Sequence, residues 1–369
     1  MNSILLSLYI ISGIALCVYL LYYFLPIALH EKKNMQTADA VSVIICAKNE
    51  AANLKRSIPP LLAQKHSEFE ILIIDDHSDD DSLLQLKRIA SENKRLRVIP
   101  FTGIKKTRGK KEALAFGIAN AKYDTLLLTD ADCQPLSENW ISEMTAGIDQ
   151  DHQLNIGISL LTTSRKSFFS WFVKLDAIWV ACNYIGWALR GSPYMMVGRN
   201  VCYTKTLYES SGRFDAHLHI SSGDDDLFAQ TVRYSTQTNC IIHPESQTTS
   251  AAKSTWKEWL RQKGRHHSTG IAYPKSTLLI LGLHQFFILS FYFSFFALFF
   301  TGVPLLLILA LFFLKNILYW GVFRRIFSKI GVNVHLLPFV IFELIWTVAV
   351  TMVNFYNLFR SSKNGGTWS

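Results

Sequence analysis

Hydrophobic residues are concentrated at the two ends of the chain. Residues 4–29 contain no charged side chain, and this run is long enough to span a bilayer. It is too long for the core of a signal peptide and has no basic segment before it, so residues 1–30 are expected to be a retained transmembrane anchor. Residues 275–360 are again apolar and aromatic, with a break at Arg324 and Arg325, and predict about three C-terminal transmembrane helices.

The middle of the chain alternates between short hydrophobic runs and segments with helical spacing. The runs are rich in β-branched and leucine side chains, which is typical of strands buried on both faces of a sheet. The helix after the first run is expected to stop at Pro59. The alternation predicts an α/β domain over residues 38–270 with a parallel, Rossmann-like sheet. The predicted strands are residues 41–46, 69–74, 96–100 and 125–128.

Two carboxylates follow the fourth predicted strand, one residue apart. Asp130 and Asp132 point the same way in an extended or turning backbone, so they can converge on one cation. Mg²⁺ and Mn²⁺ take few protein carboxylates and complete their shell with water and phosphate oxygens. The pair predicts a diphosphate–metal site at the sheet edge where α/β folds bind ligands, although a helix cap or solvated turn would use the same residues.

Two further polar positions belong to the same predicted edge. Asp76 follows the second strand, where it either accepts an N–H from a planar base or lies in an ordinary helix-capping loop. Lys110 follows Gly109 at the start of a helix, where it either attracts a phosphate or lies in a solvated basic turn. No G-x-G-x-x-G follows the first strand and the sequence has no P-loop, which disfavours a dinucleotide oxidoreductase or an NTPase.

The net charge indicates which class of partner the protein binds, and the cysteine content and basic flanks indicate where in the cell it lies. The 369 residues carry a formal charge of +9, which fits an anionic membrane surface and phosphate-bearing substrates, and the sequence has no aromatic-basic motif for nucleic acid. The six cysteines form no C-x-x-C pair, as in proteins with reduced cytosolic thiols. Basic residues such as Lys32, Lys33 and Lys257 flank the apolar segments. We therefore expect a multi-pass plasma (inner) membrane protein whose middle domain is cytoplasmic.

Seven short motifs occur in a fixed order through the middle of the chain. They are residues 41–50, 75–79, 109–114, 129–132, 198–215, 223–227 and 262–266. With these motifs in this order, the chain resembles the membrane-bound family 2 glycosyltransferases, and the resemblance extends over residues ~40–270. It implies a GT-A fold that binds a nucleotide-sugar, a UDP-sugar donor, together with Mg²⁺ or Mn²⁺.

The resemblance also implies roles for single residues. Asp76 corresponds to the carboxylate that binds uracil, Asp132 to the main metal ligand, and Asp130 to the partner carboxylate against the ribose or sugar. The other residues implied in donor binding are Asn49, Glu50, Lys110, Arg199, Asn200, Gln262 and Arg265.

The acidic cluster after Gly223 corresponds to the place of the catalytic base. Asp224 matches the general base, but Gly223 stands where the family has Glu, so Asp225 is an alternative. A helix N-cap with acids in the first turn would explain the same cluster. His266 stands where processive synthases have a Trp, which favours addition of a single sugar.

Two features concern the membrane. Residues 168–190 are rich in Trp and are expected to form either an interfacial helix or a buried helix of the domain. His284, Lys315 and Glu343 interrupt the C-terminal apolar runs, and intramembrane ionisable groups often line a path for a polar substrate.

The predicted activity is an inverting, metal-dependent transfer of a hexose from a UDP-sugar to a lipid-linked or glycan acceptor at the cytoplasmic membrane face. One carboxylate deprotonates the acceptor hydroxyl, while a cation with Lys or Arg stabilises the leaving diphosphate. Two alternatives are a processive polysaccharide synthase and a catalytically inactive membrane scaffold of the same fold.

Overall fold

The computed structural model describes residues 2–105, 109–164, 166–220, 223–333 and 339–361, with the backbone alone at 265–269, 271 and 357–361. The chain forms two compact units. We call residues 31–252 the sheet unit, and residues 1–30 together with 253–369 the helical unit.

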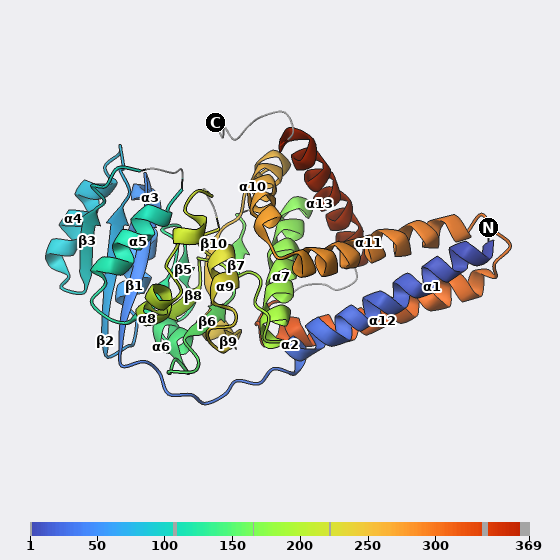
Figure 1. Ribbon diagram of the computed structural model, residues 1–369, viewed down its shortest axis with the longest axis horizontal. Coiled ribbons are helices and arrows are strands. Elements are labelled where there is room, and N and C mark those ends of the chain that lie inside the picture. Colours follow the sequence, from blue (N-terminus) through green and yellow to red (C-terminus); the bar gives the residue numbers. More distant parts are fainter. Residues whose placement is uncertain (1, 106–108, 165, 221–222, 334–338, 362–369) are drawn as a thin grey trace. The chain divides into compact units, whose positions relative to one another are not determined.

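A seven-stranded sheet in the order β3-β2-β1-β4-β8-β6-β9 forms the centre of the sheet unit (Figure 1). Its first four strands are parallel and lie where the sequence predicts them. They are β1 (Ala40–Ala47), β2 (Glu68–Asp75), β3 (Leu96–Pro100) and β4 (Thr125–Leu128).

The other half of the sheet consists of strands that the hydrophobic pattern does not predict, and one of them is antiparallel to its neighbours. Strand β8 (Val201–Thr204) is antiparallel to both β4 and β6 (Leu154–Gly157), and β9 (Thr238–Ile241) is parallel to β6. The chain enters β8 at the edge where β4 ends. This mixed α/β sheet therefore brings the residues before β8 beside those after β4.

A second sheet of three short strands accompanies the main one. Strand β10 (Thr248–Ala251) pairs antiparallel with β5 (Gln134–Pro135) and parallel with β7 (Ser159–Thr162). Because β5 lies two residues after Asp132, this small sheet holds the chain just beyond the carboxylate pair.

Helices cover both faces of the parallel strands. On one face, α3 (Ala51–Leu62) packs Leu54 and Ile58 into a core with Val43 and Ile45 of β1. On the other face lies α5 (Lys111–Asn120), where a Cβ at Gly117 would come within 2.9 Å of Ile74 and 3.1 Å of Ile44. The glycine thus permits close helix–sheet packing, and burial on both faces explains the apolar strands.

Helix α3 does not stop at Pro59 as predicted but continues through Pro59 and Pro60 to Leu62. The prolines remove N–H groups near the end of the helix, and the carbonyls of Lys55 and Arg56 that lose these donors belong to exposed residues. Leu61 beyond the prolines is fully buried, and its burial offsets the lost hydrogen bonds.

The remaining helices of the sheet unit include the Trp-rich segment. Helix α7 packs against β7 and β9, and the Tyr184 hydroxyl donates a hydrogen bond to the Gly157 carbonyl at 2.9 Å. Trp179 and Trp187 are buried. Contact of α7 with a membrane stays a prediction. The remaining helices of the sheet unit are α4 (Ser82–Glu92), α6 (Trp140–Thr145), α7 (Phe168–Leu189), α8 (Lys205–Ser210) and α9 (Asp226–Val232).

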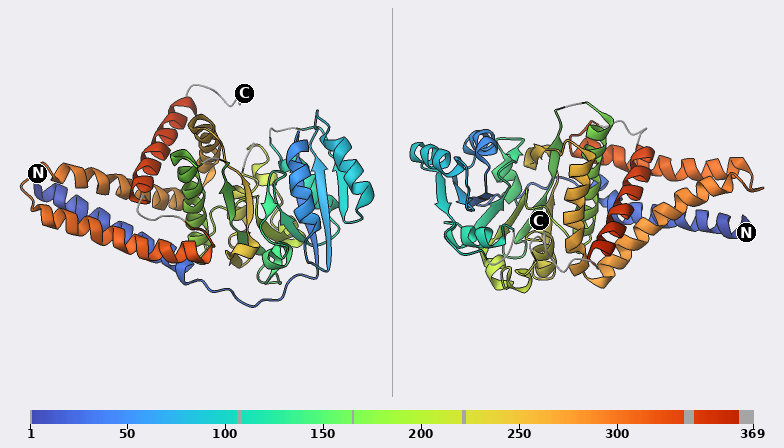
Figure 2. Two further views of the ribbon diagram at one scale, coloured as in Figure 1. Left: turned by 180° about the vertical axis from the view of Figure 1, so that it is seen from behind. Right: turned by 90° about the horizontal axis from the view of Figure 1, so that it is seen from above.

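The helical unit has four helices, within its described part, that are long and apolar enough to cross a membrane. One is N-terminal and three are C-terminal, as expected, and they indicate a membrane protein. The N-terminal helix lies alongside α11 and α12 (Figures 1 and 2). The elements are α1 (Asn2–Tyr19), a π-helical turn (Leu20–Phe24), α2 (Leu25–Leu29), α10 (Trp256–Thr269), α11 (Lys275–Leu298), α12 (Leu305–Lys329) and α13 (Phe339–Ser361).

Two ionisable side chains predicted inside the membrane pair with each other. Lys315 of α12 and Glu343 of α13 form an ion pair with side chains 2% and 1% exposed, and Tyr292 of α11 donates its hydroxyl to Glu343 at 2.6 Å. The imidazole of His284 stacks on Tyr19, with ring centroids 3.7 Å apart. The Lys315–Glu343 ion pair together with Tyr292 therefore links α11, α12 and α13.

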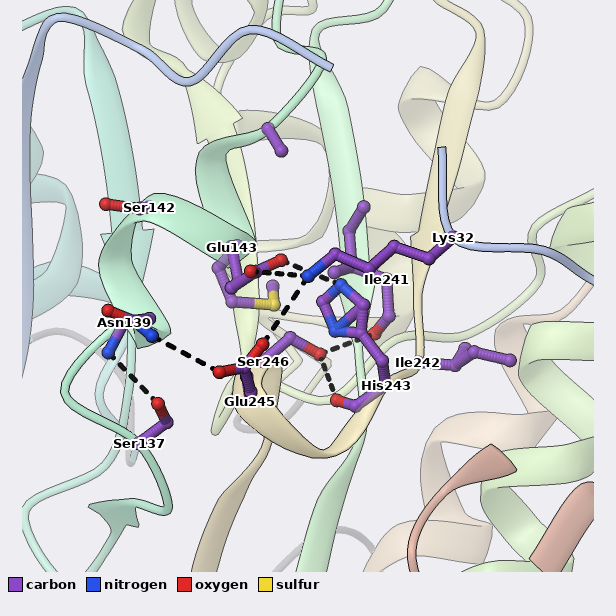
Figure 3. Close-up of polar contacts among 12 residues, drawn as sticks. Lys32, Ser137, Asn139, Ser142, Glu143, Ile241, Ile242, His243, Glu245 and Ser246 are labelled. Atoms are coloured by element: carbon purple, nitrogen blue, oxygen red, sulfur yellow. Dashed lines mark hydrogen bonds and ion pairs between the residues drawn. The ribbon is translucent and has the colours of Figure 1, made fainter. Parts of the chain in front are cut away.

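Within the sheet unit, polar contacts hold the segment that begins at residue 31 (Figure 3). Lys32 Nζ lies 2.6 Å from Glu143 Oε1 and 3.5 Å from Glu245 Oε2. His243 Nε2 lies 2.8 Å from Glu143 Oε2, and Asn139 Nδ2 donates to Glu245 at 3.2 Å. These contacts fix the start of the domain against α6 and the turn after β9.

Candidate active site

A tight turn after β4 sets the positions of Asp130 and Asp132. The Thr129 N–H donates to the Ile44 carbonyl of β1 at 3.3 Å, and the Cys133 N–H closes the turn on the Asp130 carbonyl at 3.0 Å. Cys133 is buried, whereas Asp130 is half-buried and Asp132 is exposed. The turn thus presents both carboxylates at the end of the parallel strands.

Lys110 joins this turn to the loop that precedes α9. Its Nζ lies 2.7 Å from Asp130 Oδ1 and 3.2 Å from Asp224 Oδ2. Burial alone would lower the pKa of Lys110, but Asp130, Asp224 and Asp225 together hold it well above its usual value. The ammonium therefore stays charged and neutralises part of a carboxylate cluster.

The two candidate bases have different surroundings. Asp225 is the N-cap of α9: its Oδ1 accepts from the Asp226 N–H at 2.9 Å and its Oδ2 from the Gly198 N–H at 3.0 Å. Asp224 instead faces Lys110. Burial raises the pKa of Asp224 against the opposing charge of Lys110, and Asp225 adds to the rise. The N-cap interpretation therefore holds for Asp225, and Asp224 has the better environment for a base.

Gly223 and Gly198 explain how the loop fits this edge. Gly223 has φ of 82°, a conformation that a side chain such as Glu would strain. A Cβ at Gly198 would lie 3.3 Å from Lys110 Nζ and 3.6 Å from the side chains of Asp224 and Asp225. Both glycines allow the loop before α9, the residues before β8 and Lys110 to approach one another closely.

Asp76 follows β2 and is 4% exposed. Its carboxylate is paired with Lys105, and His77 Nδ1 lies 3.3 Å from its other oxygen. Lys105 Nζ also donates to the Gly109 carbonyl at 2.8 Å. Lys105 was missed at the sequence level, although it begins a basic stretch between β3 and α5 that could have revealed it.

Asn49 and Glu50 lie directly after β1. Asn49 has φ of 56°, its N–H donates to Ser78 Oγ at 3.0 Å and its side chain accepts from the Asp79 N–H at 2.7 Å. The Glu50 N–H donates to Ser82 Oγ at 2.9 Å. Asn49 thus connects the loop after β1 to the loop after β2, and Glu50 connects it to the start of α4; donor contact stays a prediction.

Arg199 and Asn200 precede β8. Arg199 donates to Ser250 Oγ at 3.0 Å, and its carbonyl accepts from Thr129 Oγ1 at 3.0 Å. Asn200 is fully buried: its amide accepts from Trp140 Nε1 at 2.9 Å and donates to the carbonyls of Ile158 and Ser246, each at 2.8 Å. The Asn200 amide is therefore engaged within the fold, where it holds β8 in place.

Gln262 and Arg265 belong to α10 of the helical unit. Gln262 is half-buried, and the side chains of Arg265 and His266 lie outside the described residues. Their predicted roles stay predictions.

Cys46, near the end of β1, lines a small cavity together with Lys110, Thr129 and Gly198. Burial raises the pKa of Cys46 to about 12, and the charges of Lys110, Asp224, Asp130 and Asp76 all contribute to this pKa. Charged residues that follow β2 and β4, and others that precede α5 and α9, thus lie within electrostatic reach of Cys46.

The carboxylate pair has the chemistry of a cation site. Asp130 and Asp132 supply the hard oxygen ligands that Mg²⁺ and Mn²⁺ prefer. Among the described residues no group of three His, Cys, Asp or Glu side chains is placed to hold an ion. The pair therefore fits an ion that keeps water and substrate phosphates in its shell, and it does not form a closed protein cage.

Comparison with known proteins agrees with this geometry. Over 96% of this chain and 99% of the other, the structure is similar to the mannosyltransferase PcManGT from Pyrobaculum calidifontis in complex with GDP-Man and Mn²⁺, with a TM-score of 0.61 and 15% sequence identity. At this identity the likeness shows the fold. The class that the sheet defines is therefore that of mixed α/β proteins with a GT-A-like fold.

The sequence comparisons assign one segment of the chain to a family. Residues 42–196 match the sequence model of Glycosyl transferase family 2, and this segment is a family 2 glycosyltransferase domain, as the motifs predict. The poly-beta-1,6-N-acetyl-D-glucosamine synthase of Staphylococcus aureus is 29% identical over 99 residues, which are 27% of this chain and 23% of the synthase. The protein CsbB of Bacillus subtilis is 31% identical over 116 residues, 30% of this chain and 34% of CsbB. The chain thus matches less than two thirds of either relative.

Proposed function

We propose that this protein transfers a sugar from a UDP-sugar to a lipid-linked or glycan acceptor, with inversion, at the cytoplasmic face of a membrane. The observation that supports this most is the position of Lys110 between Asp130 and Asp224, because it unites the carboxylate pair after β4 with a candidate base. The family 2 domain and the apolar helices support the class and the membrane location.

In the proposed reaction, Asp224 accepts the proton of the acceptor hydroxyl as that oxygen bonds to the anomeric carbon. The bond from this carbon to the diphosphate breaks on the opposite face, and UDP leaves. A divalent cation held by Asp130 and Asp132 would supply positive charge to the leaving diphosphate. Lys110 orients the Asp224 carboxylate and contributes a second, fixed positive charge.

Replacing Asp132 with Ala is expected to abolish transfer, because the exposed carboxylate of the pair is the proposed main ligand of the cation. The assay uses the purified full chain in lipid nanodiscs with Mn²⁺ and measures UDP release from a panel of UDP-sugars. Asp151→Ala removes an exposed carboxylate from the loop before β6 and should keep the wild-type rate.

The same preparation separates the alternatives when GDP-mannose is added to the panel and the length of the products is measured. A wild-type protein that folds but releases no nucleotide would favour the inactive scaffold. Products that grow by many sugars would favour a processive polysaccharide synthase over single addition. Release of nucleotide from GDP-mannose alone would contradict the UDP-sugar assignment.

Asp76→Ala is expected to weaken UDP binding about 10–150-fold, the equivalent of about 1.5–3 kcal/mol for a hydrogen bond to a charged group. Isothermal titration of UDP measures this change, and the melting temperature checks the fold. Asp80→Ala is the matched control in the same loop. The Asp80 side chain makes a local contact, since it accepts from the Ser82 N–H at 3.0 Å. Unchanged UDP affinity in folded Asp76→Ala would remove the base-binding role.

A further inference from the structure

A second lysine, next to Lys110, has its side chain inside the protein. Lys111 is the first residue of α5 and is 2% exposed. Its Nζ donates to the carbonyls of His217 at 2.7 Å and Ile220 at 2.9 Å. These carbonyls belong to the backbone that leads from β8 and α8 toward Asp224. Two consecutive lysines therefore contact this part of the chain in different ways. The Lys110 ammonium contacts the side chain of Asp224, whereas the Lys111 ammonium contacts two backbone carbonyls.

The segment held by Lys111 is anchored at its other end by aromatic packing. Phe214 is 1% exposed, and its ring centroid lies 4.9 Å from that of Tyr208 and 5.8 Å from that of Phe228 in α9. His217, three residues later, is also buried. The backbone before the candidate base is thus fixed at Phe214 by packing, and at His217 and Ile220 by one ammonium group.

Holding this loop with a buried lysine has an energetic cost. Burial lowers the pKa of Lys111 to about 8, while the charges of Asp224 and Asp225 act in the opposite direction. An apolar side chain would avoid this cost but would leave two carbonyls without their donor. The ammonium supplies donors for both carbonyls and lies within electrostatic reach of the two carboxylates.

We propose that Lys111 is a positioning residue: by clamping the carbonyls of His217 and Ile220, it fixes the approach of the chain to Asp224 and so sets the geometry of the base. This inference rests on the proposed transfer function. It assigns to Lys111 a task different from phosphate attraction, which remains the expectation for Lys110.

The test compares Lys111→Met, which keeps the apolar stem and removes the donors, with Lys111→Arg, which keeps charge and donors. Lys205→Met is the matched control, because Lys205 Nζ also donates to a backbone carbonyl, that of Ala119, at 3.2 Å. Lys205 follows Thr204, which pairs with Thr125 at the start of β4, so this lysine lies at the opposite edge of the sheet from the site. We expect kcat of Lys111→Met to fall about 10–100-fold, as for a misplaced catalytic group, with KM for the donor changed by less than about threefold.

Hydrogen exchange of a peptide covering residues 214–220 gives a readout that does not need activity. Exchange should become faster in Lys111→Met, remain near wild type in Lys205→Met, and recover in part, together with kcat, in Lys111→Arg. Unchanged exchange, a kcat within about twofold of wild type, or a loss that equals the fraction of unfolded protein would each overturn the inference. If the wild type transfers no sugar, the proposed function fails and the positioning role fails with it. An active wild type with an unaffected Lys111→Met overturns the inference alone.

Discussion

Asp224→Asn is expected to reduce the rate of sugar transfer about 10²–10⁴-fold, the range that a positioned general base contributes. The amide keeps the size of the side chain and can still accept from Lys110, so the fold and donor binding should persist. Single-turnover transfer with saturating donor measures the loss. Because burial raises the pKa of Asp224, the acid limb of kcat/KM in the wild type should lie at a higher pH than the usual aspartate pKa of about 4.

The neighbouring carboxylate provides the control. Asp225→Asn should affect stability more than chemistry, because Asp225 accepts from the backbone N–H groups of Gly198 and Asp226. An amide has one acceptor oxygen, so this variant loses one of the two bonds. If Asp225→Asn loses more activity than Asp224→Asn while remaining folded, the base is Asp225.

Glu343→Leu is expected to destabilise the helical unit by about 3–5 kcal/mol, because it leaves the buried ammonium of Lys315 without its counter-charge. The hydroxyl of Tyr292 also loses its acceptor. The thermal midpoint and the monodisperse yield of the full chain in detergent report this effect.

A double variant distinguishes pairing from a loss of packing. Lys315→Met combined with Glu343→Leu removes both charges and should restore most of the stability. Arg324→Met removes an exposed charge from the same helix and should change the midpoint little. A double variant less stable than Glu343→Leu would show that the pair is not the cause. Wild-type transfer in the double variant would show that a polar substrate does not need these charges.

The parallel half of the fold was predictable because its strands are apolar on both faces. Val43 and Ile45 face α3 while Ile44 faces α5, so the run is continuous and its ends are marked by polar residues. The small strands were not predictable in this way. Strands such as Thr248–Ala251 are short and polar, and they form because tertiary packing places a partner beside them.

The sequence order indicated that the carboxylates lie at one sheet edge, but it did not indicate which lysines they contact. Asp76 and Asp130 follow β2 and β4, and Asp224 precedes α9; their roles in the reaction stay predictions. Lys105 could not be assigned to Asp76 because that contact joins two loops across 29 residues. The predicted end of α3 was also wrong. Leu61, beyond the prolines, is buried by tertiary contacts that the periodicity of the sequence does not reveal.

The fixed ammonium of Lys110 has a consequence for how the protein matures. Folding gathers several negative side chains in one place, and their mutual repulsion would oppose the last stage of assembly. Because the polypeptide carries its own counter-charge to that place, a newly synthesised chain need not wait for a metal or a nucleotide before it becomes compact. Under the proposed mechanism, a shortage of divalent ions would therefore lower the rate of sugar transfer and leave the amount of folded protein unchanged.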